Sequence, residues 1–180
     1  MNPKIIKTSD GSHSLYREDL DENYHSIHGA INEANHVFIK NGLEFVAENK
    51  SEISIFEMGF GTGLNALVTR NFALENNLII SYSSVENHPL PYGLCDKLNY
   101  NKELKFSDLN SFYESLHLSK WSEPVELEKD FILHKIDGKI ESIVLIEKYD
   151  LIYFDAFGPR AQSNMWTIEI FQKLYDALNT

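Results

Sequence analysis

Short apolar runs alternate with amphipathic stretches through most of the chain. The apolar runs, rich in β-branched residues, occupy positions 53–57, 78–85, 131–136 and 151–155. Such runs are typical of strands covered on both faces of a sheet, and we expect the run at 151–155 to be fully buried. Segments with helical spacing of apolar residues lie at about 24–40, at 63–75 and from about 167 onward. Strands that alternate with helices predict an α/β fold with a doubly wound, mostly parallel sheet.

Local signals set the expected ends of several elements. The dipeptide Asp10-Gly11 predicts a hairpin turn near the N-terminus. Asn41-Gly42 is expected to end the helix that begins near Tyr24. The last helix should bury one face, which carries Ile168, Phe171, Leu174, Tyr175 and Leu178.

The remaining stretch, residues 89–125, is predicted to be helical and irregular, with core side chains from Leu116, Leu118 and Trp121. We therefore expect residues 1–50 to form a hairpin and helix cap. Residues 51–180 should form a Rossmann-like core, so that the whole chain makes one structural domain.

Charge and composition narrow the class of function. The 180 residues carry a net charge of −11 at pH 7, which argues against nucleic-acid binding over the whole surface but leaves room for a local basic patch. No run approaches the roughly 20 apolar residues that a membrane helix needs. The single cysteine, Cys95, and an N-terminus without an apolar signal region predict a cytoplasmic protein.

A glycine-rich turn follows the first apolar run and is the strongest single motif. Glu57 precedes Gly59, Gly61 and Gly63 at alternating positions, where the absence of a Cβ lets backbone approach a ligand closely. The third glycine comes one residue too early for a dinucleotide fingerprint, and no Gly-Lys-Ser/Thr follows as in a P-loop. A carboxylate at this place suits a ligand with hydroxyls and a cationic end, such as S-adenosylmethionine.

Acidic residues follow each of the predicted parallel strands. Glu57, Glu86, Asp137 and Asp155 come at or just after the ends of these strands. Ligands of such sheets bind outside the carboxyl ends of the strands, so we expect these carboxylates to share one cleft. Glu86 lies about 20 residues beyond the glycines, where an acidic residue would hold the ribose hydroxyls.

Three segments together carry a specific resemblance: residues 60–65 (FGTGLN), residues 84–90 (SVENHPL), and residues 155–159 (DAFGP) with the Asn164-Met165-Trp166 that follows. With these motifs the chain resembles the MnmC-like methyltransferase family, whose members use S-adenosylmethionine to methylate the aminomethyl group on the wobble uridine of certain tRNAs. The run at residues 24–30 also resembles the opening of single-domain members. The resemblance implies a class I methyltransferase fold, and it implies the anticodon region of tRNA as partner.

The resemblance also implies roles for matching residues. The cofactor would contact Glu57, Gly59, Gly61, Gly63, Asn65, Glu86 and, at adenine, Asp137. The acceptor amine would lie beside Asp155, in a catalytic segment that includes Phe157 and Pro159. A carboxylate there can orient an amine and help to remove its proton. The substrate would also meet Tyr24, His25 and Trp166, since unstacked anticodon bases are commonly held on aromatic faces.

Alternative interpretations remain open at this point. One is a nicotinamide-dependent oxidoreductase, and another is a truncated cofactor-binding module without turnover. His25 and His28 have no third ligand at metal spacing, so no metal site is expected. Related methyltransferases continue beyond the length of this chain, so we expect a partner chain or a missing C-terminal segment to cover the edge of the fourth strand.

Overall fold

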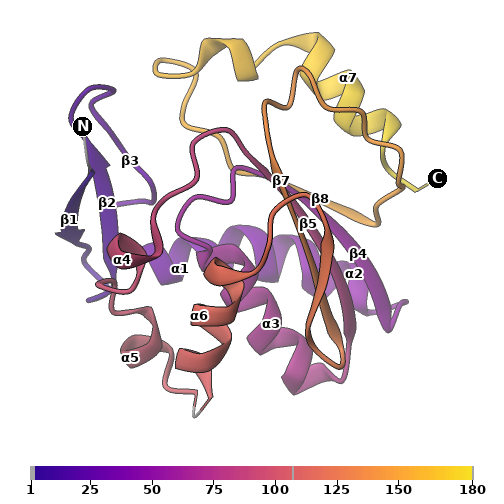
Figure 1. The fold of residues 1–180 in the computed structure, drawn as a ribbon, viewed down its shortest axis with the longest axis horizontal. Coiled ribbons are helices and arrows are strands. Elements are labelled where there is room, and N and C mark those ends of the chain that lie inside the picture. The colour runs from indigo at the N-terminus through magenta and orange to yellow at the C-terminus, as the bar shows by residue number, and fades with distance from the viewer. Residues whose placement is uncertain (1–2, 107, 180) are drawn as a thin grey trace.

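The computed structural model describes residues 3–106 and 108–179 and contains a five-stranded sheet and a smaller three-stranded sheet near the N-terminus (Figure 1). The larger sheet has the order β6-β7-β5-β4-β8. Its strands are β4 (Glu52–Met58), β5 (Ile79–Glu86), β6 (Pro124–Glu128), β7 (Phe131–Asp137) and β8 (Leu151–Phe154). All neighbouring pairs in it are parallel except β6 with β7. The predicted α/β fold with a mostly parallel sheet is therefore confirmed.

The strand order reverses beside β4. The chain runs outward from β4 to β5 and then to β7, and it returns to the other side of β4 as β8. The loops that follow β4 and β8 consequently leave the sheet in different directions. A crevice at such a reversal is where open α/β sheets hold their ligands.

Helices cover both faces of the sheet (Figure 1). One face packs on a group that includes α3 (Leu64–Asn76), α5 (Tyr100–Leu104) and α6 (Leu109–Leu118), and the other packs on α7 (Ile168–Asp176). Alternate residues of β4 divide between these layers, as strand geometry requires. Ile55 belongs to the first layer, and Phe56 and Met58 belong to the second.

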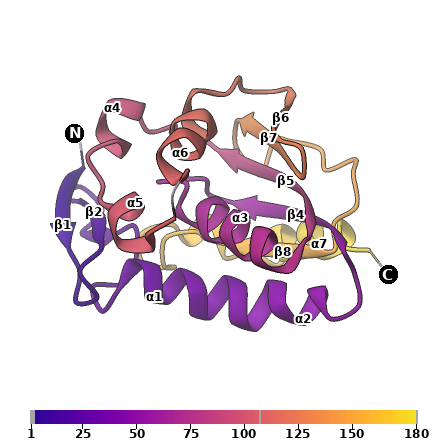
Figure 2. The ribbon, with the colours of Figure 1, turned by 90° about the horizontal axis from the view of Figure 1, so that it is seen from below.

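The helix expected at residues 24–40 begins later and continues further. Figure 2 shows one unbroken rod made of α1 (Ala30–Ala34), the π-helical segment η1 (Asn35–Leu43) and α2 (Glu44–Ala47). The expectation that Asn41-Gly42 ends this helix is wrong. A Cβ on Gly42 would lie 3.6 Å from Leu151 and 3.7 Å from Tyr153, which are ordinary contact distances, so this glycine lies inside the helix on the side that packs against β8.

The prediction for residues 89–125 missed a strand. The segment contains α4 (Tyr92–Cys95), α5 and α6, but it ends in β6, which pairs antiparallel with β7. Leu116 is buried as expected and Trp121 packs against the core, whereas Leu118 is exposed. The inward face of α6 carries Leu109, Phe112, Tyr113 and Leu116, and Leu118 falls outside this stripe.

The C-terminal elements are less buried than predicted. β8 pairs with β4 on one side, and Leu151, Ile152 and Phe154 are only partly buried because β8 is an edge strand. In α7 the buried residues are Ile170 and Leu174. The expected face is therefore wrong in part, since Ile168, Phe171 and Tyr175 are exposed. That a partner chain or a further C-terminal segment covers the β8 edge of the sheet stays a prediction.

The N-terminal sheet contains β1 (Lys4–Lys7), β2 (His13–Arg17) and β3 (Glu22–Asn23), in that order. The hairpin predicted around Asp10-Gly11 is confirmed by the antiparallel pairing of β1 with β2. The Asp10 carboxylate accepts hydrogen bonds from the backbone N–H groups of Ser12 and Asn32, which joins this turn to α1. The division of the chain at residue 50 stays a prediction, and Met1, Asn2 and Thr180 at the ends of the two proposed parts lie outside the described residues.

None of the helices built from the described residues is both long and apolar enough to cross a bilayer.

Candidate active site

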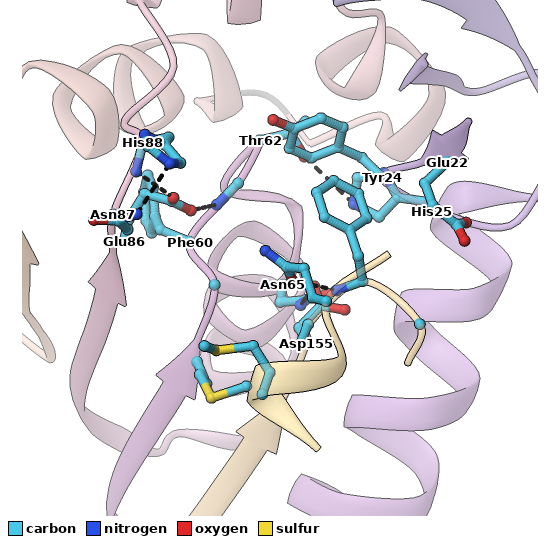
Figure 3. Close-up of a pocket in the computed structure, with 18 of the residues that line it drawn as sticks. Glu22, Tyr24, His25, Phe60, Thr62, Asn65, Glu86, Asn87, His88 and Asp155 are labelled. Atoms are coloured by element: carbon cyan, nitrogen blue, oxygen red, sulfur yellow. Dashed lines mark hydrogen bonds between the residues drawn. The ribbon is translucent and has the colours of Figure 1, made fainter. Parts of the chain in front are cut away.

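A cavity of about 750 Å³ lies outside the carboxyl ends of the parallel strands (Figure 3). Its walls come from the turn after β4, the end of β5, the segment after β7 and the loop after β8, and residues 22–28 of the N-terminal region close it on another side. The volume is in the usual range for a site that encloses a small organic ligand.

The glycine-rich turn adopts a shape that requires glycine. Gly59, Gly61 and Gly63 have φ values of +97°, +50° and +74°, a region that side chains with a Cβ rarely adopt. A Cβ on Gly59 would lie 2.5 Å from the backbone oxygen of Asp155. The turn after β4 and the loop after β8 therefore meet through direct backbone contact at the point where the strand order reverses.

Glu86 is oriented by backbone amides at the wall of the cavity. Its Oε2 accepts a hydrogen bond from Gly61 N at 3.1 Å, and its Oε1 accepts one from His88 N at 2.8 Å (Figure 3). Each carboxylate oxygen can accept a second hydrogen bond. The side chain thus offers two preset acceptors to a ligand with neighbouring hydroxyl groups.

Asn65 joins two carboxyl groups at the floor of the site. Its Nδ2 donates to Glu57 Oε1 at 3.0 Å and to Asp155 Oδ2 at 2.8 Å. Glu57 is fully buried and also accepts a hydrogen bond from Ser84 Oγ at 2.7 Å. Asp155 and Asn65 line the cavity, whereas Glu57 lies beneath it.

Burial changes the acid strength of both carboxyl groups. Burial, together with the charge of Asp155, raises the pKa of Glu57 to about 8. Burial also raises the pKa of Asp155 to about 7, against the opposing effect of the Asn65 hydrogen bond. Because Glu57 is the more enclosed of the two, it retains a proton at neutral pH, and the negative charge of the pair resides on Asp155.

The N-terminal wall contacts the loop after β8. The rings of Tyr24 and Phe157 meet edge to face with their centroids 5.0 Å apart. Arg160 forms an ion pair with Glu22 at 3.0 Å. A contact within the loop after β8 also fixes Phe157: its backbone N–H donates to Gln162 Oε1 at 3.0 Å.

His25 lies between the N-terminal sheet and the glycine-rich turn. Its Nδ1 is 3.1 Å from Ser14 Oγ, and its Nε2 is 3.4 Å from Thr62 Oγ1. Burial lowers the pKa of His25 to about 4, so the ring is neutral at physiological pH. Among residues 3–106 and 108–179 no group of three or more histidine, cysteine or acidic side chains is arranged to hold a metal.

The structure brings most of the predicted site residues to this cavity. Those that line it are Tyr24, His25, Gly59, Gly61, Asn65, Glu86, Asp155 and Phe157. Those outside its lining are Glu57, Gly63, Asp137, Pro159 and Trp166.

The residues outside the lining have other places. Gly63 precedes α3 behind the turn, and Asp137 is exposed at the end of β7, where Gly138 and Lys139 line the cavity instead. Trp166 donates from Nε1 to the backbone oxygen of Phe157 at 2.9 Å. Pro159 is exposed in the loop that follows Phe157.

Sequence reasoning missed residues that support the site. Ser84 reaches Glu57 because the two are register partners in the pairing of β4 with β5, and register cannot be read from the sequence alone. Gln162 was missed for a similar reason, since its contact with Phe157 depends on a loop shape.

Comparisons with known proteins agree with this architecture. The model of a family described as S-adenosyl-L-methionine-dependent methyltransferase matches residues 108–180. The bifunctional protein MnmC of Burkholderia multivorans, named for tRNA 5-methylaminomethyl-2-thiouridine biosynthesis, is 30% identical over 164 residues, which cover 84% of this chain and 25% of the relative. The protein of the same name from Leptospira interrogans is 31% identical over 186 residues, 87% of this chain and 26% of that protein.

A solved structure shares the fold. The crystal structure of MNMC2 from Aquifex aeolicus matches with a TM-score of 0.79 and 23% identity over 98% of this chain and 57% of that one. The chain spans about a quarter of the length of the curated relatives it matches.

Replacing Gly59 by alanine should destabilise the fold because the new Cβ meets the Asp155 backbone and φ stays positive. We expect a loss of about 1–3 kcal/mol in unfolding free energy from the strained backbone alone, measured by urea denaturation. Gly93→Ala is the matched control, since a Cβ there meets nothing within 4 Å. Equal stability of the two variants would show that the turn can move away from β8.

Glu57→Gln should reduce the dependence of stability on pH. Burial raises the pKa of Glu57 to about 8, from an ordinary value of 4.5. The stability that the bound proton contributes is therefore complete below about pH 4.5 and is lost as the pH rises toward 8. We therefore expect the variant to be more stable than the wild type at pH 8.5, by denaturation measured across pH. Glu75→Gln, at an exposed position on α3, is the control, and a wild-type profile in both variants would contradict the buried protonated state.

Proposed function

The chain belongs to the S-adenosyl-L-methionine-dependent methyltransferases, and we propose that it methylates the aminomethyl group of the wobble uridine in tRNA at the cavity described above. The printed names of its relatives concern 5-methylaminomethyl-2-thiouridine in tRNA. A methylaminomethyl group differs from an aminomethyl group by one methyl on nitrogen. A methyl donor supplies that difference.

The residues of the cavity fit S-adenosylmethionine. Gly59 and Gly61 line the cavity without side chains, and Glu86 presents two oriented acceptors for the ribose hydroxyls. Glu33 and Asp155 add negative charge to the same cavity, which complements the sulfonium and ammonium of the ligand. When bound, the cofactor supplies an electrophilic methyl group.

Asp155 is placed to receive the acceptor amine. It lines the cavity directly beside the glycine-rich turn, and the Asn65 amide fixes one oxygen of its carboxylate. The carboxylate attracts an ammonium group, orients it and takes up a proton, which leaves the lone pair on nitrogen free for attack. A pKa near 7 suits this exchange at neutral pH. Alignment of the amine with the methyl group then contributes much of the rate.

The base itself would be held by aromatic side chains. Phe157 and Tyr24 line the cavity and pack edge to face, and single-stranded bases are commonly stacked on such rings. The indole Nε1 of Trp166 donates a hydrogen bond to the backbone oxygen of Phe157. We propose that the tRNA anticodon region binds at the opening of the cavity beside Phe157 and Tyr24. We also propose that the reaction takes place in the cytoplasm, where tRNA is found.

The observation that carries the proposal is a partly buried, hydrogen-bonded carboxylate, Asp155, which directly follows β8 and is in backbone contact with the glycine-rich turn. The spacing of Gly59, Gly61 and Gly63 differs from the dinucleotide fingerprint, which argues against a nicotinamide oxidoreductase. The remaining alternative is a module that binds the cofactor without turnover. Transfer of labelled methyl from S-adenosylmethionine to tRNA that lacks the modification distinguishes this module from the enzyme.

Asp155→Asn should lower methyl transfer by about 10²–10⁴-fold, because the amide cannot accept the proton of the amine. Cofactor affinity, measured by calorimetry, should stay within a few fold. The wild-type rate should rise with pH through about 7 as Asp155 ionises, and the variant should lack this inflection. Normal turnover by the variant would remove Asp155 from the mechanism, and cofactor binding by a wild-type chain that transfers no methyl would favour the binding module.

Glu86→Ala should weaken cofactor binding by roughly 1–3 kcal/mol, the usual value of lost hydrogen bonds to a charged group. The dissociation constant for S-adenosylmethionine, measured by calorimetry, is the readout. Glu86→Gln keeps the shape and one acceptor oxygen, so its loss should be smaller. An unchanged dissociation constant in Glu86→Ala would place the ribose elsewhere.

A further inference from the structure

A completely buried lysine lies beneath the glycine-rich turn. Lys135, on β7, has no exposed surface, and its Nζ donates to the backbone oxygen of His117 at 2.7 Å. The same ammonium lies 4.8 Å from the ring centre of Trp121 and 5.6 Å from that of Phe60. Within the described part of the chain it forms no ion pair with a carboxylate. Burial lowers the pKa of Lys135 to about 8, so it is mostly charged at neutral pH.

The contacts of Lys135 lead to both neighbours of Gly61. On one side the ammonium lies against the ring of Phe60. On the other side it holds the backbone of His117, whose Nε2 is 3.1 Å from the carbonyl oxygen of Thr62. Burial lowers the pKa of His117 to about 4, so the ring is neutral and donates from Nε2 to this carbonyl. Phe60 and Thr62 are thus both in reach of the pair Lys135 and His117, and the Thr62 carbonyl also accepts a hydrogen bond from Tyr113 Oη at 2.8 Å.

The turn depends on such support because its own backbone is permissive. A glycine has no side chain to restrict its backbone. Three glycines with positive φ fall within the five residues 59–63. The Gly61 N–H that orients Glu86 belongs to the peptide between Phe60 and Gly61. Any drift of this peptide would move both a cavity wall and the acceptor that we assign to the ribose.

We propose that Lys135 is a positioning residue that, through Phe60 and His117, holds the glycine-rich turn in the shape that binds the cofactor. The inference rests on the proposed function in one respect, namely that this turn contacts S-adenosylmethionine. A buried cation without a carboxylate partner is costly to stability, and an apolar side chain would fill the same space without that cost. Compared with an apolar side chain, the ammonium adds a hydrogen-bond donor to His117 and, through its charge, an attraction to the faces of two rings.

The test compares cofactor affinity in matched variants. Lys135→Met keeps the volume but removes donor and charge, and it should weaken binding of S-adenosylmethionine by at least about tenfold, equivalent to 1.4 kcal/mol. Lys135→Arg restores the cation and should recover affinity to within about threefold. The readouts are the dissociation constant by calorimetry and the stability by urea denaturation of the full chain.

Arg70→Met is the matched control for the loss of a buried cation. Arg70 is also buried and also faces a ring, that of Phe112 at 5.0 Å, but its partners Asp108 and Glu128 lie away from the cavity. Its replacement should lower stability and leave the affinity of the folded protein unchanged. An equal loss of affinity in Arg70→Met and Lys135→Met would overturn the proposal, because general destabilisation would then explain both.

A second variant covers failure of Lys135→Met to fold. Lys135→Gln keeps a donor for His117 but no charge, and it should still weaken binding. An unchanged dissociation constant in either variant overturns the positioning role. A wild-type protein that binds no S-adenosylmethionine would instead contradict the proposed function, so the two failures are distinguishable.

Discussion

A single amide group between two carboxyl groups holds the site together. The Nδ2 of Asn65 donates to both Glu57 and Asp155. Glu57 is fully buried, so ionising both carboxyl groups that share this amide carries a large penalty. Ser84 donates a further hydrogen bond to Glu57, and Glu57 has no exposed surface. The arrangement concentrates negative charge on the member that faces the cavity.

The topology of the sheet determines where this pair can form. Glu57 lies within β4 and Asp155 follows β8, and these neighbouring strands are separated by almost a hundred residues of chain. The helix α3 begins after the turn that leaves β4, and its second residue is Asn65. The reversal of strand order next to β4 therefore brings the carboxylates, the amide and the glycine-rich turn together in one place.

Much of the fold and of the candidate site is predictable from local sequence pattern, and the features that are not have physical reasons. The four parallel strands and the residues at their ends follow from apolar runs that stop at an acidic residue or a glycine. The depth of Glu57 did not follow, because a carboxylate in a strand is normally placed at the surface unless its partners are known. The sequence misplaces the end of this helix because the dipeptide Asn41-Gly42 has the same residue types whether it ends a helix or lies inside one. Lys135 did leave a signal: it alternates with the buried Phe131 and Leu133 in β7, which puts it on the inward face.

The position of residues 22–28 against the cavity has a consequence for acid strength. Burial is the largest cause of the raised pKa of Asp155, and part of that enclosure comes from a segment that lies far upstream in the chain. Without this wall, the cavity beside the carboxylate would be more open to bulk water, and burial would raise the pKa of Asp155 less. The N-terminal region thus helps to tune a proton acceptor more than a hundred residues away by excluding solvent from it.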